Sequence, residues 1–264
     1  MKTIAITNQK GGCGKTTTAV NLAAALAQKG YRTLIVDLDP QGHATLGLGA
    51  IPENIEHTIY DVLVDSSIRL PNIVLSTQID QLMLVPCNVL LSGAESKLTQ
   101  MHDREYILRN RLTSVEPYFD YCIIDCSPSL SLLTLNALVA ANEAMIPVQT
   151  HYYAIEGLKQ VLETLEIVRD RFTPGLKIGG ILLTLAERRT MLSRDVERQM
   201  REFFGTLVFE TVIHRSIRLA EAPSAGQSIM TYDPKNNGAI EYNQLAEEIC
   251  YEKVRTTETN FVHI

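Results

Sequence analysis

The stretch from residue 8 to residue 17, NQKGGCGKTT, combines glycine, lysine and threonine at a spacing suited to holding phosphate. Glycines let backbone N–H groups converge on phosphate oxygens, and the start of a following helix adds a favourable dipole. Lys15 would lie against the β- and γ-phosphates, the Thr16 hydroxyl would coordinate Mg²⁺, and Thr17 would reach the α-phosphate. The residues expected to line this site are Lys10, Gly11, Gly12, Cys13, Gly14, Lys15, Thr16 and Thr17.

The loop departs from the common pattern G-x-x-x-x-G-K-[ST], because Gln9 stands where that pattern has its first glycine. Lys10 follows, five residues before Lys15. One lysine is enough for one bound nucleotide. The second lysine therefore needs a separate explanation.

Carboxylates end two apolar runs that read as buried strands. LIVDLDPQG carries Asp37 and Asp39, and YCIIDCSPSL carries Asp125. Ligands bind at the carboxyl ends of strands in open parallel sheets, so these side chains are expected beside the glycine loop. Asp125 is expected to hold Mg²⁺ through water, and Asp39 to orient an attacking water. Asp37 is interpreted as structural, bonded to the backbone of the glycine loop.

The elements that must position these residues are apolar, β-branched runs separated by helical segments. Such alternation predicts an α/β fold, a doubly wound and mostly parallel sheet of the P-loop NTPase type. One domain over 1–255 is expected, followed by a polar tail over 256–264, while 51–75 is expected to form loops and short helices. Helical spacing covers 17–29, 155–171 and 242–254. The expected strands are 3–7, 33–38, 81–86, 121–126, 143–148, 177–185 and 207–213.

Composition limits the class of protein. The chain has 264 residues, 45% hydrophobic and 20% charged, with a mean hydropathy of +0.02, which is typical of a globular protein. No apolar run is long enough for a membrane helix, and no signal peptide opens the chain, so a cytoplasmic location is expected. A net charge of −6 argues against a protein that coats nucleic acid over its whole surface. Five cysteines, an odd number, are expected to be reduced thiols.

Four motifs together resemble the bacterial ParA/Soj partition ATPases, within the deviant Walker A group that includes MinD. They are QKGGCGKTT, VDLDPQGHAT, IIDCSPSLSLLTLNAL and IRLAEAPSAGQSI, and the resemblance runs from about residue 2 to residue 251. It implies that Lys10 is the signature lysine, which reaches the phosphates of the other subunit's ATP in a homodimer. It also implies catalytic roles for Lys10, Lys15 and Asp39, with ATP and Mg²⁺ as ligands.

The resemblance further implies a biological cycle. ATP favours a dimer that binds DNA without regard to sequence, so the protein would be nucleoid-associated. Hydrolysis is slow, and a ParB-like activator stimulates it. The cargo would be a plasmid, a chromosome or another body.

The resemblance also assigns contacts near the end of the chain. Arg189 and Arg218 match positions that bind DNA in the Soj branch, and Arg215 and Lys235 are nearby candidates. His214 and Ser216 occupy positions that contact the base, where many members have proline and asparagine. His214 could stack on the base or could be an ordinary surface histidine.

Other readings are less favoured. A MinD-like membrane-associated positioning ATPase would need an amphipathic C-terminal helix, whereas the last helical stretch is acidic in its middle. No membrane partner is expected. An amidating synthetase would need a second substrate pocket. An iron–sulfur protein would need Cys87 and Cys126 as cluster ligands, and neither has a glycine-rich setting.

Overall fold

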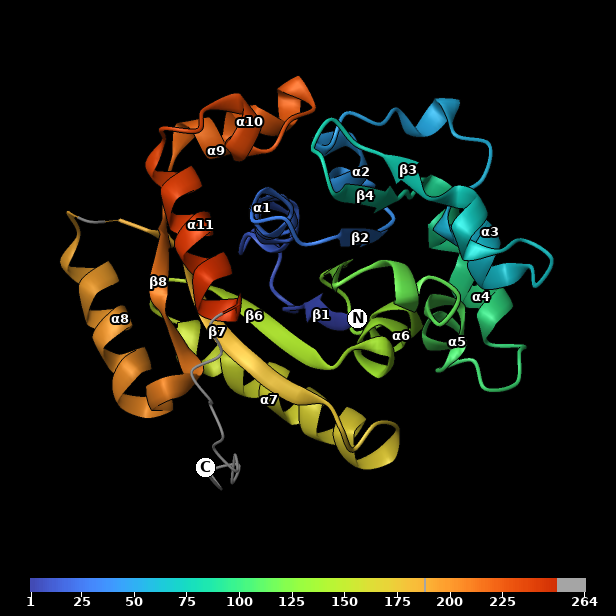
Figure 1. Ribbon diagram of the computed structural model, residues 1–264. Coiled ribbons are helices and arrows are strands. Elements are labelled where there is room, and N and C mark those ends of the chain that lie inside the picture. Colours follow the sequence, from blue (N-terminus) through green and yellow to red (C-terminus); the bar gives the residue numbers. More distant parts are fainter. Residues whose placement is uncertain (188, 251–264) are drawn as a thin grey trace.

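One mixed sheet organises the molecule. The computed structural model describes residues 1–187 and 189–250, in which eight strands follow the order β3-β4-β2-β5-β1-β6-β7-β8 (Figure 1). The strands are β1 (Lys2–Ile6), β2 (Thr33–Leu38), β3 (Leu75–Ser76), β4 (Leu82–Val85), β5 (Tyr121–Cys126), β6 (Glu143–Gln149), β7 (Lys177–Ala186) and β8 (Val208–His214).

The sheet is parallel except at one edge, where β3 runs antiparallel to β4. The doubly wound, mostly parallel fold expected from the sequence is confirmed. All seven expected strands are present within two residues of their expected ends. The short strand β3 was not expected, because two residues carry no alternation pattern.

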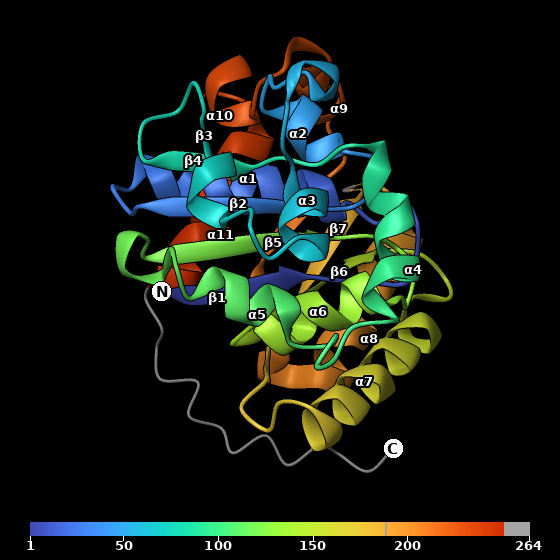
Figure 2. The ribbon, with the colours of Figure 1, turned by 90° about the vertical axis from the view of Figure 1, so that its right-hand side faces the viewer.

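Helices cover both faces of the sheet (Figure 2). One face carries α1, α2 and α9 to α11, and the other carries α3 to α8. The helices are α1 (Lys15–Gln28), α2 (His43–Gly47), α3 (Ile59–Val64), α4 (Ala94–Leu98), α5 (Ile107–Leu112), α6 (Leu132–Ala140), α7 (Ala154–Arg171), α8 (Met191–Phe204), α9 (Ile217–Glu221), α10 (Ile229–Tyr232) and α11 (Asn237–Cys250).

Alternate side chains of the strands pack into two hydrophobic cores, one on each face of the sheet. On β2, Leu34 and Val36 pack into the core beneath α3 to α8, whereas Ile35 packs into the core around α1. Successive side chains of a strand point to opposite faces, so a strand covered on both faces reads as continuously apolar. This explains why the parallel strands were recognisable as runs without polar interruptions.

The central helix α1 begins two residues earlier than its spacing indicated. It was expected from residue 17 and starts at Lys15, directly after Gly14. Its alanines, such as Ala23 and Ala25, are fully buried because the helix lies between the sheet and α11. The earlier start places Lys15 and Thr16 in the first helical turn, where they can act on a ligand.

The remaining helical expectations fare differently. The expected helix over 155–171 is confirmed as α7, and the expected short helices within 51–75 include α3. The last helix, expected from residue 242, begins at Asn237, and residues 251–254 of that expectation lie outside the described residues. The polar tail over 256–264 and the domain boundary at 255 also lie outside them. None of the described helices is both long and apolar enough to cross a membrane.

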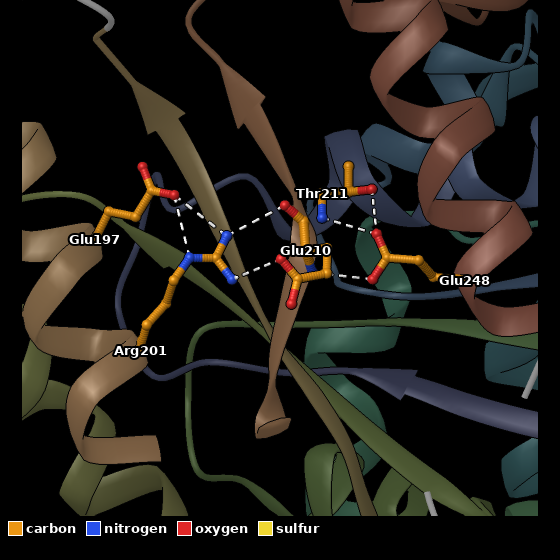
Figure 3. A network of polar contacts seen from close by, with 5 residues as sticks. All are labelled: Glu197, Arg201, Glu210, Thr211 and Glu248. Atoms are coloured by element: carbon orange, nitrogen blue, oxygen red, sulfur yellow. Dashed lines mark hydrogen bonds and ion pairs between the residues drawn. The ribbon is translucent and has the colours of Figure 1, made fainter. Parts of the chain in front are cut away.

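A polar network fastens the edge strand β8 to helices from both layers (Figure 3). Arg201 of α8 donates to the Glu210 carbonyl at 3.2 Å. Glu248 of α11 accepts from the backbone N–H groups of Glu210 and Thr211 at 2.9 and 2.7 Å. Backbone groups at this outer edge of the sheet are therefore paired with side chains.

Candidate nucleotide-binding site

Three neighbouring strands end at the same place. β5 lies between β1 and β2, and the register pairs Asp125 with Ile6 on one side and with Asp37 on the other. The chain leaves β1 at Ile6 and enters the glycine loop directly. Both carboxylates therefore lie beside the loop at the carboxyl edge of the sheet, where parallel sheets bind their ligands.

The glycine loop has the backbone shape of a phosphate cradle. Gly12 and Gly14 have φ values of 70° and 89°, in the left-handed region that side chains rarely adopt. The Thr184 hydroxyl of β7 donates to the Cys13 carbonyl at 2.8 Å and ties the loop to the sheet. Cys13 is buried, its Sγ donates to the Lys10 carbonyl at 3.3 Å, and burial raises the pKa of the thiol. Its side chain is thus a packing element of the loop.

Positive charge gathers inside this cradle. The Lys15 side chain is buried, and its Nζ donates to the Lys10 carbonyl at 3.0 Å. Gly14 at the start of α1 has no side chain that could cap the helix, and within the part of the chain that the structure describes no side chain accepts from the N–H groups of Lys15, Thr16 and Thr17. An anion at the helix start would receive these groups together with the helix dipole.

Asp125 fits a divalent cation. It is fully buried, and among the described residues neither carboxylate oxygen has a hydrogen-bond partner. Burial and the Asp37 carboxylate raise the pKa of Asp125 well above its usual range, against the opposing effects of Thr16 and Lys15. Buried polar atoms without partners are rare and costly. Thr16 and Asp125, the predicted Mg²⁺ ligands, thus supply oxygen donors that a hard cation would satisfy.

The two other carboxylates have distinct surroundings. Asp37 Oδ2 accepts from both the backbone N–H and the hydroxyl of Thr45, each at 2.7 Å, and burial raises the pKa of Asp37 to about 6. The expected bond from Asp37 to the glycine loop is wrong, since Thr45 of α2 supplies the donors instead. Asp39 is buried at the start of the next loop, where its Oδ1 accepts from the Gln41 N–H at 3.0 Å.

The second lysine of the motif lies outside the cradle. Lys10 is exposed, and its ammonium lies 3.4 Å from Gln149 Oε1 and in close contact with His151 at the end of β6. Desolvation, followed by the Lys10 charge, lowers the pKa of His151. Lys15 and Lys10 therefore occupy different environments, one inside the loop and one on its rim.

The predicted base contacts line a pocket of about 750 Å³. His214, the last residue of β8, and Ser216, two residues later, lie on its wall together with Asn236, which precedes α11, and Glu241 of α11. Tyr242, the residue after Glu241, contacts the Thr18 hydroxyl of α1 at 3.2 Å, so α11 contacts the helix that follows the glycine loop and also contributes to the pocket.

The predicted DNA-binding residues fall into two groups. Arg215 pairs with Glu187 at 3.0 Å, and Arg218 pairs with Glu221 at the same distance. Arg189 and Lys235 are exposed and have no ion-pair partner within 1–187 and 189–250. Arg189 and Arg215 also line the pocket that holds His214.

Sequence reasoning missed the residues that support the site from a distance. Thr184 lies inside an apolar strand pattern, and nothing in LLTLA indicates that its hydroxyl holds the glycine loop. Glu241 lies 27 residues after His214, and Asn236 lies 20 residues after Ser216. Only the packing of α11 against β8 brings these pairs together.

Comparisons with known proteins agree with this geometry. A family model described as an AAA domain, AAA_31, matches residues 1–178. Sporulation initiation inhibitor protein Soj of Bacillus subtilis is 48% identical over 94% of this chain and 98% of that protein. Chromosome partitioning protein ParA of Myxococcus xanthus is 46% identical over 93% of this chain and 87% of that protein.

Solved structures share this fold, and one of them holds an ATP analog. Cobyrinic acid a,c-diamide synthase from Mycobacterium smegmatis, solved with an ATP analog and magnesium, superposes with a TM-score of 0.83 at 36% identity, over 95% of this chain and 94% of that chain. The cell division ATPase MinD of Pyrococcus furiosus gives 0.78 at 26% identity, over 94% and 98% of the two chains. The glycine loop with two lysines, the strand-end carboxylates and the similarity to Soj and ParA together show that the chain belongs to the ParA/Soj family of partition ATPases.

Proposed function

We propose that this protein is a Mg²⁺-dependent ATPase that dimerises around ATP, binds DNA without sequence preference and segregates a chromosome, plasmid or other cargo. The observation that carries the proposal is the separation of its two lysines. Lys15 is buried inside the loop, whereas Lys10 is exposed on the rim, where a second subunit could meet it. A single-chain nucleotide site would have no use for the outer lysine.

The side chains of one subunit divide the chemistry among them. Lys15 and the first-turn N–H groups of α1 hold the phosphates and stabilise negative charge that develops on them. Asp39 orients a water for attack. Thr16 and Asp125 would hold Mg²⁺, which neutralises charge on the β- and γ-phosphates when bound. Slow hydrolysis, stimulated by a ParB-like activator, would let the protein act as a timer.

Dimerisation would complete the site from outside. Two triphosphates that face one another concentrate negative charge, and Lys10 of each subunit would offset the charge of the other's nucleotide. Exposed aromatic residues lie beside this rim, with Tyr152 and Tyr153 following His151 directly and 77% and 66% exposed. An apolar rim of this kind would be covered in a face-to-face dimer.

The dimer would then present two copies of one modest basic face to DNA. Arg189 and Arg215 lie in the loops after β7 and β8, Arg218 lies in α9, and Lys235 lies in the loop before α11. Doubling such a face can offset the acidic net charge of the chain. Binding of this kind would keep the ATP form on the nucleoid.

Lys10→Ala tests the proposal. The variant should still bind nucleotide through Lys15 but should remain monomeric with a non-hydrolysable ATP analogue and Mg²⁺, as measured by light scattering. Lys177→Ala is the matched control, because Lys177 is an exposed lysine at the opposite end of the strands. A Lys10→Ala protein that dimerises like the parent would overturn the assignment.

Two alternative functions can each be tested with a simple assay. The likeness to MinD favours a membrane-associated positioning ATPase as the second candidate, and co-sedimentation with anionic liposomes in the presence of ATP would reveal it. The likeness to an amidating synthetase raises a ligase role, for which glutamine-dependent ADP release would be the signature. We expect neither activity and expect ATP-dependent retention on DNA.

A further inference from the structure

Hydrogen bonds close a buried ring that includes the backbone of Asp39, the residue proposed to orient the attacking water. Asp37 Oδ1 accepts from the Asp39 N–H at 3.3 Å, and Asp37 Oδ2 accepts from the Thr45 hydroxyl at 2.7 Å. The Thr45 hydroxyl in turn accepts from the Cys87 N–H at 2.9 Å. The Cys87 thiol donates back to the Asp39 carbonyl at 3.1 Å, which closes the ring.

The ring joins three separate parts of the chain. Asp37 lies in β2, Thr45 lies in α2, and Cys87 follows β4, which pairs with β2 in the sheet. All three side chains are fully buried, and Asp39 is only 8% exposed. The loop after β2 is therefore tied to the sheet at both backbone groups of Asp39.

The Cys87 thiol can act as a donor in this ring. Burial, followed by the Asp37 carboxylate, raises the pKa of the thiol, so the sulfur keeps its proton. The Asp39 carbonyl accepts one further bond, from the Gly42 N–H at 2.8 Å, and the Asn88 carbonyl is the next nearest acceptor to the thiol at 3.3 Å. A thiol is a weak donor, so the Thr45 hydroxyl is the stronger member of the ring.

The ring bears on the direction of the Asp39 carboxylate. Asp39 Oδ1 accepts from the Gln41 N–H at 3.0 Å, which is a bond within the same loop and moves with it. The place of the carboxylate therefore depends on where the backbone of Asp39 is held. A displacement of about 1 Å at a reacting group can cost on the order of 10²-fold in rate.

We propose that Thr45 and Cys87 are positioning residues for ATP hydrolysis and that they act by holding the backbone of Asp39. The proposal rests on the role given to Asp39 in the proposed function. It adds which residues, distant in sequence, keep that carboxylate in place. Binding of the phosphates belongs to Lys15 and the glycine loop and does not depend on the ring.

Thr45→Val is the first test, because valine keeps the shape of the side chain but removes the hydroxyl. Asp37 then loses one donor, and the Cys87 N–H loses its acceptor. We expect the turnover number for ATP to fall about tenfold while the affinity for Mg-ADP is kept. Thr45→Ser retains the hydroxyl and should turn over ATP at the parent rate. Steady-state phosphate release and titration calorimetry with Mg-ADP are the measurements.

Cys87 provides a second and milder pair of variants. Cys87→Ala should lower turnover about threefold, and Cys87→Ser, which keeps a donor, should restore it. Cys122→Ala is the matched control, because Cys122 is an equally buried thiol of β5 that pairs with Leu34, three residues before Asp37. This control should leave turnover unchanged. Thermal unfolding of each variant reports whether the fold is retained.

A double variant separates positioning from a general structural effect. Asp39→Ala removes the carboxylate that the ring positions, so adding Thr45→Val to it should not slow turnover further. If Thr45→Val slows the Asp39→Ala protein by the same factor as the parent, Thr45 does not act through Asp39 and the inference is overturned.

The single variants distinguish this inference from the proposed function. If Asp39→Ala alone turns over ATP at the parent rate, the proposed role of Asp39 fails and the inference fails with it. Should Asp39→Ala slow turnover while Thr45→Val and Cys87→Ala do not, the proposed function stands and the positioning by Thr45 and Cys87 is wrong.

Discussion

Asp125 lowers the stability of the ligand-free fold but supplies the carboxylate that a bound cation would need. Its buried oxygens have no partner among the described residues, so the ligand-free fold bears the cost of an unsatisfied group. The pKa of Asp125 is raised in the folded state. At a pH between the ordinary aspartate pKa and this raised pKa, the folded protein therefore keeps a proton on Asp125 that the unfolded chain has released. The unfolding free energy of the ligand-free protein should therefore fall as pH rises above the ordinary range of an aspartate.

Asp125→Asn removes this charge. We expect the ligand-free variant to be more stable at neutral pH by about 1–3 kcal/mol, to lose that pH dependence, and to gain less stability from Mg-ADP than the parent does. Urea denaturation at several pH values, with and without Mg-ADP, measures all three effects. An Asn variant that Mg-ADP stabilises as much as the parent would remove Asp125 from the metal site.

Asp39 makes a separate prediction, because it begins the loop after β2 and bonds the Gln41 N–H. Asp39→Ala should slow ATP turnover on the order of 10²-fold while nucleotide affinity is kept, since only the orientation of water is lost. Steady-state phosphate release and ADP titration measure the two quantities. Unchanged turnover would show that another residue directs the water.

The chemistry of single residues was easier to predict than their neighbours. The glycine loop is local in sequence, so its spacing alone predicts backbone shape and the placement of Lys15 and Thr16. The Glu241 contact to His214 depends on how α11 packs on β8, and no local pattern carries it. Asp37 was interpreted as structural from its place at the end of a strand, but its partner Thr45 could not be read from spacing alone.

At the scale of elements, side chains of α8 and α11 bind the backbone of β8, the edge strand of the sheet. Arg201 approaches it from the helix on one face and Glu248 from the helix on the other (Figure 3). Unpaired edges invite pairing with other chains, so the two side chains block a surface for strand addition. The parallel strands were predicted because they are buried on both faces, whereas this protection of the edge has no sequence signature.

Glu248→Ala should lower the unfolding free energy by about 1–2 kcal/mol and increase aggregation, because the Glu210 and Thr211 N–H groups lose their acceptor. Urea denaturation and light scattering are the measurements. Glu247→Ala is the control, since its exposed pair with Lys29 should contribute less than about 1 kcal/mol. Equal losses in the two variants would show that the edge contacts add nothing.

At the scale of the whole molecule, the proposed basic face must work within a chain of net charge −6. Two of its arginines already pair with glutamates, so Arg189 and Lys235 have the charge most available to phosphate. Arg189→Glu or Lys235→Glu should reduce ATP-dependent DNA retention and lower the salt slope of binding by about 1 per removed contact.

Filter binding at several salt concentrations measures retention and slope together. Lys177→Glu makes the same charge change at the opposite end of the strands and should leave both unchanged, apart from a small effect of net charge. ATP hydrolysis should survive in all three variants. Retention that is equally weak in the control would mean that net charge, and not a face, governs binding.

The strand order also governs how the chain can be made. β1 is synthesised first, but its neighbours in the sheet are β5 and β6, with Ile6 beside Asp125 and Met145. A ribosome must therefore translate past residue 126 before the first strand gains one neighbour, and past residue 145 before it gains the second. Until then the apolar strand β1 is exposed in the nascent chain. Nucleotide cannot stabilise these early stages, because Asp125 reaches the glycine loop only when β5 has joined β1.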